Sequence, residues 1–296
     1  MQRREFLQQS LAVGAGWALH SATGAPLTAF AKDEAEKVMR FGLVTYLWGQ
    51  DWDLPTLLQN CERTGVLGVE LRTTHAHGVE PSLSAAERAE VRKRFADSPV
   101  TNVGIGSNGR YDNPDPAVVQ KAIEATKAYI VLSHDIGTTG VKVKPDRFYD
   151  DVPHEQTIEQ IGRSLNELGK FAEGYGQQVR LEVHGQCKDP PTIKAITDIA
   201  DHPSVALCWN SNPADLEGAG LEANFAMLRQ RFGETCHVRE LDDEKYPFAK
   251  LIELLYDSQY TGWVLLEASS KPADRVAALQ EQRELFEQYL ADARAK

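Results

Sequence analysis

Residues 179–185 read VRLEVHG, a short strand-like run that ends in a glutamate, a histidine and a glycine. Three further strand-like runs follow in the second half of the chain: VALCWN at 205–210, CHVREL at 236–241 and WVLLEA at 263–268. Helical segments are expected after the four runs, at about 190–200, 221–232, 246–257 and 272–293. Strands that alternate with helices predict a parallel sheet.

The first half of the chain shows the same alternation four times. Strands are expected at 39–47, 66–71, 100–106 and 137–144, and helices at 54–65, 84–98, 116–134 and 154–174. Eight strands, each followed by a helix, predict a single α/β domain, a closed (β/α)8 TIM barrel over residues 32–296, close to the roughly 250 residues typical of that fold. An open doubly wound sheet is the alternative, but no glycine-rich strand-to-helix turn marks a dinucleotide site.

The first 31 residues are expected to be an export signal rather than part of the fold. RREFL at 3–7 resembles the start of a twin-arginine signal, and AFA at 29–31 resembles a cleavage site. We therefore expect residues 1–31 to be removed and the folded protein to be exported to the periplasm. An ordinary amphipathic N-terminal helix is the alternative. A second apolar stretch of about 20 residues is absent from the sequence, so no stable membrane insertion is expected.

Charge and cysteine content narrow the classes of partner. The chain has 296 residues and a formal net charge of −11 at pH 7. A nucleic acid or an anionic membrane would require a basic face, so neither is an expected partner. The four cysteines lack metal-binding or redox spacing and are expected to be packed thiols. Cys208 and Cys236 should point to opposite faces of their strands and therefore should not form a disulfide.

Polar residues follow the apolar parts of the predicted strands. In a TIM barrel the catalytic groups project from the carboxyl ends of the strands. Unpaired charges are costly to bury, so these groups should pair with one another, bind an ion or face a wet pocket. In strand order they are Trp48; Glu70 and Arg72; Ser107 or Asn108; Lys142 and Lys144; Glu182 and His184; Asn210 and Asn212; His237 and Arg239; and Glu267.

Glu182 and Glu267 give the strongest individual signals, because each follows a run of apolar residues directly. Two carboxylates that converge on a barrel mouth can hold a divalent cation, and one of them can act as a proton-transfer base. Simple salt bridges to Lys142 or Arg239 are the alternative. The expected catalytic residues are Glu182, Glu267, Arg239 and Lys142. The expected substrate-binding residues are Trp48, Glu70, His184 and Asn212, with Trp48 stacking on a sugar face.

Over roughly residues 40–292 these features resemble the xylose-isomerase-like TIM-barrel superfamily. The markers are GVEL at 68–71, LEVHG at 181–185, VALCWN at 205–210, HVREL at 237–241 and GWVLLE at 262–267. The superfamily includes sugar-phosphate isomerases, keto-sugar epimerases and endonuclease-IV-type enzymes. The resemblance implies a divalent metal held by Glu, Asp, His and Glu from strands five to eight. It also implies proton transfer next to a carbonyl, with the two glutamates as acid and base.

The implied metal ligands are Glu182, Asn210, His237 and Glu267. Asn210 stands where the family has aspartate, and Arg239 stands where the family's His-x-His ending has its second histidine. An asparagine is a weaker ligand and an arginine cannot coordinate a metal.

Two interpretations therefore remain open. In the first, Mn²⁺ or Mg²⁺ binds these residues, with His237 or His184 as the imidazole ligand. In the second, Arg239, with Lys142, supplies the positive charge in place of the metal.

The sequence thus predicts an exported isomerase or epimerase, or a related lyase, that acts on a small-molecule sugar or keto-sugar. A glutamate would remove the proton next to a carbonyl while a cation stabilises the enolate oxygen. The alternative is a non-catalytic carbohydrate-binding barrel with a degenerate metal site, which Asn210 and Arg239 favour. DNA hydrolysis of the endonuclease-IV type conflicts with the acidity of the chain.

Overall fold

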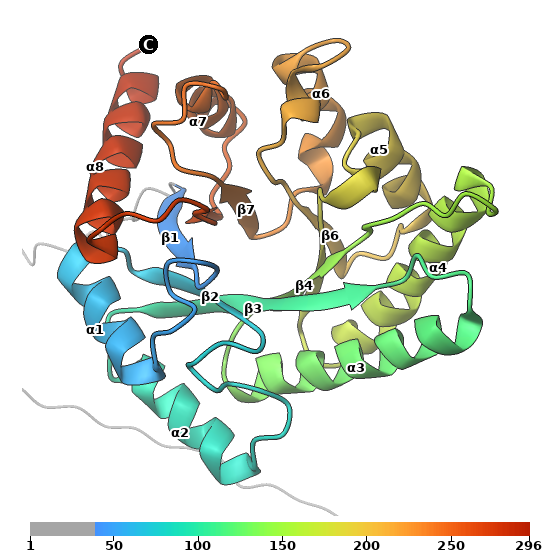
Figure 1. The fold of residues 1–296 in the computed structure, drawn as a ribbon, viewed down its shortest axis with the longest axis horizontal. Helices are drawn as coiled ribbons and strands as arrows, with labels where there is room; N and C mark the ends of the chain where they lie inside the picture. The colour runs from blue at the N-terminus through green and yellow to red at the C-terminus, as the bar shows by residue number, and fades with distance from the viewer. Residues whose placement is uncertain (1–38) are drawn as a thin grey trace, which may run out of the picture. The chain divides into compact units, whose positions relative to one another are not determined.

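The computed structural model describes residues 39–296, so the predicted export signal at 1–31 lies outside the described residues. Eight strands occupy the centre and helices α1 to α8 surround them (Figure 1). The strands are β1 Arg40–Val44, β2 Gly68–Arg72, β3 Thr101–Arg110, β4 Gly140–Lys144, β5 Gln178–Glu182, β6 Val205–Cys208, β7 Thr235–Val238 and β8 Trp263–Leu266. The helices are α1 Leu54–Thr64, α2 Ala85–Ala96, α3 Pro116–Asp135, α4 His154–Glu173, α5 Pro190–Ile199, α6 Leu221–Leu228, α7 Phe248–Asp257 and α8 Arg275–Arg294, with short 3-10 helices η1 Gly185–Cys187, η2 Pro213–Leu216 and η3 Arg229–Arg231.

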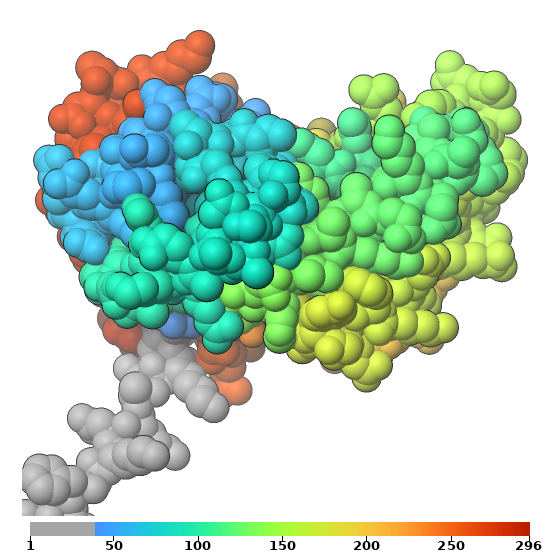
Figure 2. All heavy atoms as spheres, turned by 90° about the horizontal axis from the view of Figure 1, so that it is seen from below, coloured from blue at the N-terminus to red at the C-terminus, as the bar shows by residue number. Residues whose placement is uncertain are grey.

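The strands form one parallel sheet in the order β6-β5-β4-β3-β2-β1-β8-β7. Two isolated parallel bridges, Leu207 to Phe232 and Asn210 to His237, connect the β6 edge to the β7 edge. The sheet is therefore a nearly closed barrel, which confirms the predicted (β/α)8 fold. Figure 2 shows a face on which the colours run in order from blue to yellow, with red beside blue, so successive units of the chain are neighbours on this surface.

Local sequence signals account for several helix ends. Asp53 caps α1 through a hydrogen bond from the Thr56 amide, and Gly65 ends this helix in the left-handed conformation with φ of 70°. Ser84 and Glu87 form a capping box at the start of α2, each bonding the other's backbone amide. None of the helices in residues 39–296 is long and apolar enough to span a membrane.

Strand ends are where the sequence reading was least accurate. β1, β5, β6, β7 and β8 end two or three residues earlier than predicted, while β3 runs four residues further, to Arg110. β3 extends because its pairing with β4 shifts register between Gly106 and Arg110, as at a bulge. Beyond the shortened strands, regular pairing gives way to isolated contacts such as the Asn210–His237 bridge, at the carboxyl ends where the barrel mouth lies.

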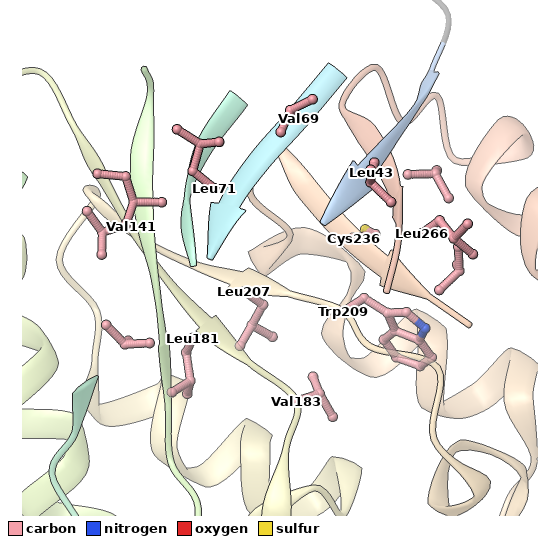
Figure 3. Close-up of a cluster of buried hydrophobic side chains, with 14 of the residues drawn as sticks. Leu43, Val69, Leu71, Val141, Leu181, Val183, Leu207, Trp209, Cys236 and Leu266 are labelled. Atoms are coloured by element: carbon pink, nitrogen blue, oxygen red, sulfur yellow. The ribbon is translucent and has the colours of Figure 1, made fainter. Parts of the chain in front are cut away.

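The main hydrophobic core lies between the barrel and its helices. Figure 3 shows part of it, with alternate residues of the strands, such as Leu181 and Val183 of the β5 segment, contributing side chains. Trp209 packs there against Phe225 of α6, with ring centroids 5.8 Å apart, so its side chain points toward the helices. Cys236 belongs to the same cluster, and all four cysteines are buried free thiols. The strand residues between these apolar positions point into the barrel, where the polar groups of the site are found.

Candidate active site

Five charged side chains are fully buried inside the barrel. One of them, Arg180 of β5, lies 3.3 Å from Glu234, which is itself partly exposed. The other four are Glu70 of β2, Lys142 of β4, Glu182 of β5 and His237 of β7, and we call these four the buried quartet. Lys142 Nζ lies 2.6 Å from Glu182 Oε2, an ion-pair distance. His237 contacts both glutamates, with Nε2 3.2 Å from Glu70 Oε1 and Nδ1 3.7 Å from Glu182 Oε1. Two carboxylates and two basic groups thus meet in a space that water does not reach.

Glycines of β3 make room for the quartet. A Cβ atom on Gly106 would lie 2.8 Å from Glu70 Oε1, closer than real Cβ atoms approach. Gly104 and Gly106 are two of the glycines of β3, the strand beside Glu70, so the VGIG sequence leaves space for a carboxylate that a larger residue would displace.

The quartet is close to electrically neutral. Burial alone would raise the pKa of Glu182, but the charges of Lys142 and His237 hold it well below its usual value. Burial would lower the pKa of His237, yet the Cys208 sulfur and the Glu70 carboxylate raise it well above its usual value. The Lys142 ammonium is held in its charged form by Glu182. Each buried charge therefore has a counter-charge within the quartet.

Glu267 connects the quartet to the exterior. Its Oε2 lies 3.8 Å from His237 Nδ1, and its side chain is 15% exposed, whereas Glu70 and Glu182 are fully buried. His237 thus lies between Glu182 and Glu267, a place that the sequence interpretation gave to Arg239 or a metal. Arg239 is exposed at the rim, where its backbone amide donates to Ser211 Oγ at 3.2 Å.

Glu182, His237 and Glu267 could hold a metal ion, since one ligand atom from each lies within 4.8 Å of the others. Neighbouring ligands of a small divalent ion, at bonds of about 2.1 Å, are about 3 Å apart. The observed separations of 3.7 and 3.8 Å would need only a modest contraction. His237 Nδ1 has no hydrogen-bond partner among the described residues, so its lone pair is available when the ring is neutral. The three residues therefore fit an ion.

The expected fourth ligand, Asn210, is engaged by the protein. Its Nδ2 donates to Glu182 Oε1 at 2.8 Å, so the amide would have to turn over to present its oxygen. An aspartate there would repel Glu182 when no cation is bound. His184, the other imidazole considered, has its Nδ1 2.5 Å from Asp146 Oδ1. The candidate metal site therefore offers three strong donors, Glu182, His237 and Glu267, and one weak donor, Asn210.

A cavity of about 990 Å³ opens at the carboxyl ends of the strands. Of the residues predicted at those ends, it is lined by Arg72, Lys144, His184, Asn210, Asn212, Arg239 and Glu267. Asn212 also braces this wall, since its Nδ2 donates to the backbone oxygens of Val183 and Asn210 at 2.8 Å each. Among the three carboxylates near His237, only Glu267 reaches the cavity.

Trp48 does not lie where a substrate-binding residue should. It is buried in the main core, is not among the cavity-lining residues, and donates from Nε1 to the Ser270 backbone oxygen at 3.0 Å. The cause is that β1 ends at Val44, which leaves Trp48 in the following turn, folded back onto the core. Glu70, also predicted to bind substrate, lies below the cavity and contacts His237 instead.

The lining residues that were not singled out from the sequence include Tyr46 and Asp146. Asp146 follows Lys144-Pro145 at the end of β4 and has a positive φ of 64°. It joins His184 to Arg110, whose Nη1 lies 2.6 Å from Oδ2. The hydrogen bond to His184, and then the one to Arg110, lower the pKa of Asp146 to about 2. The Pro-Asp pair immediately after a strand was the available signal.

A family description, the xylose isomerase-like TIM barrel, matches residues 58–289. The chain belongs to this family. Members of the wider fold include L-ribulose 3-epimerase, with a TM-score of 0.75 at 17% identity over 87% of this chain and 96% of that chain. A second is the 3-keto-D-glucoside 4-epimerase YcjR from E. coli, with a TM-score of 0.72 at 14% identity over 84% and 99%. A third is the probable 3-DHS dehydratase AsbF from Bacillus anthracis, with a TM-score of 0.65 at 15% identity over 84% and 99%.

At these identities the solved structures show a shared fold and no more. No curated protein sequence matches this chain. Within the xylose isomerase-like family, the site described above must therefore be interpreted from its own residues.

Proposed function

We propose that this protein is a sugar or keto-sugar isomerase or epimerase, or a related lyase, that removes a proton next to a carbonyl group. The observation that carries the proposal is the position of Glu267. It is the one carboxylate beside the buried quartet that also lines the cavity. A base must reach the proton that it removes, and Glu70 and Glu182 are fully buried.

In the proposed reaction a Glu267 oxygen takes the proton from the carbon adjacent to the carbonyl. The electron pair of the broken C–H bond forms a C=C bond, and the carbonyl π electrons move to oxygen as an enolate. Addition of a proton to the neighbouring carbon gives an isomer, and loss of a leaving group from the next carbon gives the lyase product. An epimer forms when a second proton donor adds a proton to the opposite face, because Glu267 can return its proton only to the face from which it was taken. All three outcomes share this first step.

The buried quartet fixes the charge and position of the groups beside Glu267. Lys142 and His237 hold Glu182 ionised and fixed, and His237 in turn positions the Glu267 carboxylate 3.8 Å away. Arg239, on the cavity wall, is the residue available to stabilise the enolate oxygen. A divalent ion on Glu182, His237 and Glu267 would supply Lewis-acid polarisation of the carbonyl when bound.

The structural neighbours support the same class of reaction, since two of them are named as sugar 3- or 4-epimerases and one as a dehydratase. We also propose export to the periplasm, on the strength of RREFL at 3–7. Export favours a free sugar or an oxidised glycoside as substrate over a sugar phosphate.

A non-catalytic carbohydrate-binding barrel is the second candidate. It is favoured by the way Glu182 is satisfied without an ion, through Lys142 at 2.6 Å and the Asn210 amide at 2.8 Å. In this case the cavity would bind sugars and the proton would stay in place.

A panel of ketoses separates the two candidates. The full chain would be incubated with L-ribulose, D-fructose, D-tagatose, D-allulose and 2-keto-D-gluconate, with and without a chelator, and products separated by ion chromatography. We expect turnover of at least one, reduced about 1000-fold or more by Glu267→Gln and unchanged by the exposed control Glu155→Gln. Binding without turnover in the parent protein would favour the second candidate.

A further inference from the structure

The cavity has more basic than acidic residues, although the chain is acidic overall. Acidic residues outnumber basic ones by 43 to 32 in the whole sequence. In the cavity lining the order is reversed: the basic residues are Arg72, Lys144, Arg147, Lys188 and Arg239, and the acidic ones are Asp146, Asp150, Asp151 and Glu267. This concentration is local and does not follow from a generally basic surface.

No direct ion pair joins the five cavity cations to the carboxylates of the cavity within the described residues. Within residues 39–296, none of the five cations forms an ion pair with a carboxylate. Asp146, an acidic residue of the same wall, is already held by Arg110 at 2.6 Å and by His184 at 2.5 Å. The cavity cations are therefore available to a ligand.

Arg72 is positioned by neutral groups alone. Its Nη1 donates to Asn108 Oδ1 at 3.1 Å, and its guanidinium carbon lies 5.5 Å from the centre of the Tyr46 ring. Its backbone amide donates to Thr45 Oγ1 at 2.9 Å. These contacts restrict the side chain without neutralising it, as expected for an arginine that awaits an anion.

Lys144, at the end of β4, shares this part of the cavity. It is partly buried, and burial lowers its pKa. The positive charge of Lys142 lowers the pKa of Lys144 further, and the charge of Arg72 does the same. The charge of Glu182 opposes this effect, but Glu182 is already paired with Lys142 at 2.6 Å. Arg72 and Lys144 therefore remain as two cations without an ion-pair partner on the same cavity wall, where a bound anion would be stabilised.

We propose that the substrate carries an anionic group, and that Arg72 and Lys144 bind this group on the β2–β4 side of the cavity. A carboxylate agrees with the proposed export, whereas a phosphate would count against export. The inference rests on the proposed function, because it describes the substrate of the same site. β8 lies four strands from β4 around the barrel, so Glu267 stands across the mouth from Lys144. A substrate anchored by its anionic end would thereby extend toward the proposed base.

Two matched pairs of small molecules test this at low ionic strength. D-gluconate is compared with D-sorbitol, and D-glucose 6-phosphate with D-glucose, by isothermal titration calorimetry on the full chain. We expect one anion to bind about tenfold or more tightly than its neutral counterpart, since charge-assisted hydrogen bonds are strong. The anion that shows the preference identifies the group as carboxylate or phosphate.

Arg72→Gln and Lys144→Met should each remove most of that preference. The control Arg163→Gln deletes an equal charge from the outer face of α4, where Arg163 pairs with Glu159, and should leave the preference intact. Circular dichroism establishes that each variant is folded, and the two substitutions lie on different strands, so one remains informative if the other misfolds.

The proposal is overturned if neither anion binds more tightly than its neutral partner, or if the preference survives both substitutions. Binding is measured without turnover, so the result is separable from the proposed function. An anion preference without any catalysed proton transfer would support the anion site and contradict the proposed enzymatic function. Turnover of neutral sugars without an anion preference would support the enzymatic function and contradict the anion site.

Discussion

Replacing Lys142 with methionine should lower the free energy of unfolding by about 3–5 kcal/mol at neutral pH. Lys142 Nζ lies 2.6 Å from Glu182 Oε2, and both side chains are fully buried. Methionine fills a similar volume, so the main loss is the charge. Glu182 would then be buried without its nearest cation, and removal of one partner of a buried pair carries a penalty of this size.

The penalty should depend on pH. In the parent protein, burial opposes ionisation of Glu182, but Lys142 and His237 hold its pKa well below the usual 4.5. A group with a depressed folded-state pKa contributes stability above its unfolded-state pKa, and this stability is lost as pH falls through the folded-state pKa. Without Lys142 the depression is smaller. The difference between parent and variant should therefore be largest at neutral pH and should shrink in acid.

Urea unfolding followed by tryptophan fluorescence, at pH 7 and pH 4, measures both effects. Glu182→Gln in the Lys142→Met background should recover most of the lost stability, because no unpaired charge then remains at this pair. Lys194→Met, which removes an exposed partner of Asp198, is the control and should cost less than about 1 kcal/mol. A loss below about 1 kcal/mol for Lys142→Met, or no recovery in the double variant, would refute the reasoning.

Three further predictions concern other parts of the chain. Burial raises the pKa of Asp215 to about 7, so its contribution to the free energy of unfolding should fall as pH rises from about 4 to about 7. Asp215→Asn should remove this pH dependence in unfolding experiments, and an unchanged pH dependence would contradict the prediction. Gly106→Ala should destabilise the fold by about 1–3 kcal/mol and displace Glu70, because the new Cβ atom would lie 2.8 Å from Glu70 Oε1. Thermal melting would detect the loss of stability, and an unaltered melting temperature would count against the close packing of Gly106 and Glu70. Arg3→Lys with Arg4→Lys should leave the precursor in the cytoplasm on cell fractionation, whereas normal export would reject the twin-arginine proposal.

The sequence was sufficient to predict the fold and the face of the strand to which each strand-end side chain points. Side chains of a strand alternate between its two faces, which accounts for Glu182 and His237 inside the barrel and Trp209 outside it. Alternation could not say how deep a residue lies. Glu70 and Arg72 share a face, yet Glu70 is buried below the cavity and Arg72 lines it. Depth depends on the stagger between neighbouring strands, which the sequence does not reveal.

The contacts that define the site are also set by tertiary structure. Nothing near His237 in the sequence indicates that it would stand between Glu182 and Glu267, since the three residues come from different strands. Trp48 was misplaced for a related reason: an aromatic residue just after a strand can face the mouth or fold back onto the core. The early end of β1 at Val44 decides this, and that end was predicted three residues too late.

Solvent deuterium exchange tests the central claim, that Glu267 is the base of a proton-transfer enzyme. The parent protein and Glu267→Gln would be incubated in D2O with the ketose that turns over in the panel, and loss of the proton adjacent to the carbonyl followed by proton NMR. We predict catalysed exchange by the parent protein and a loss of about 1000-fold or more in Glu267→Gln, with binding of the ketose retained. Exchange at the parent rate in Glu267→Gln would contradict the account.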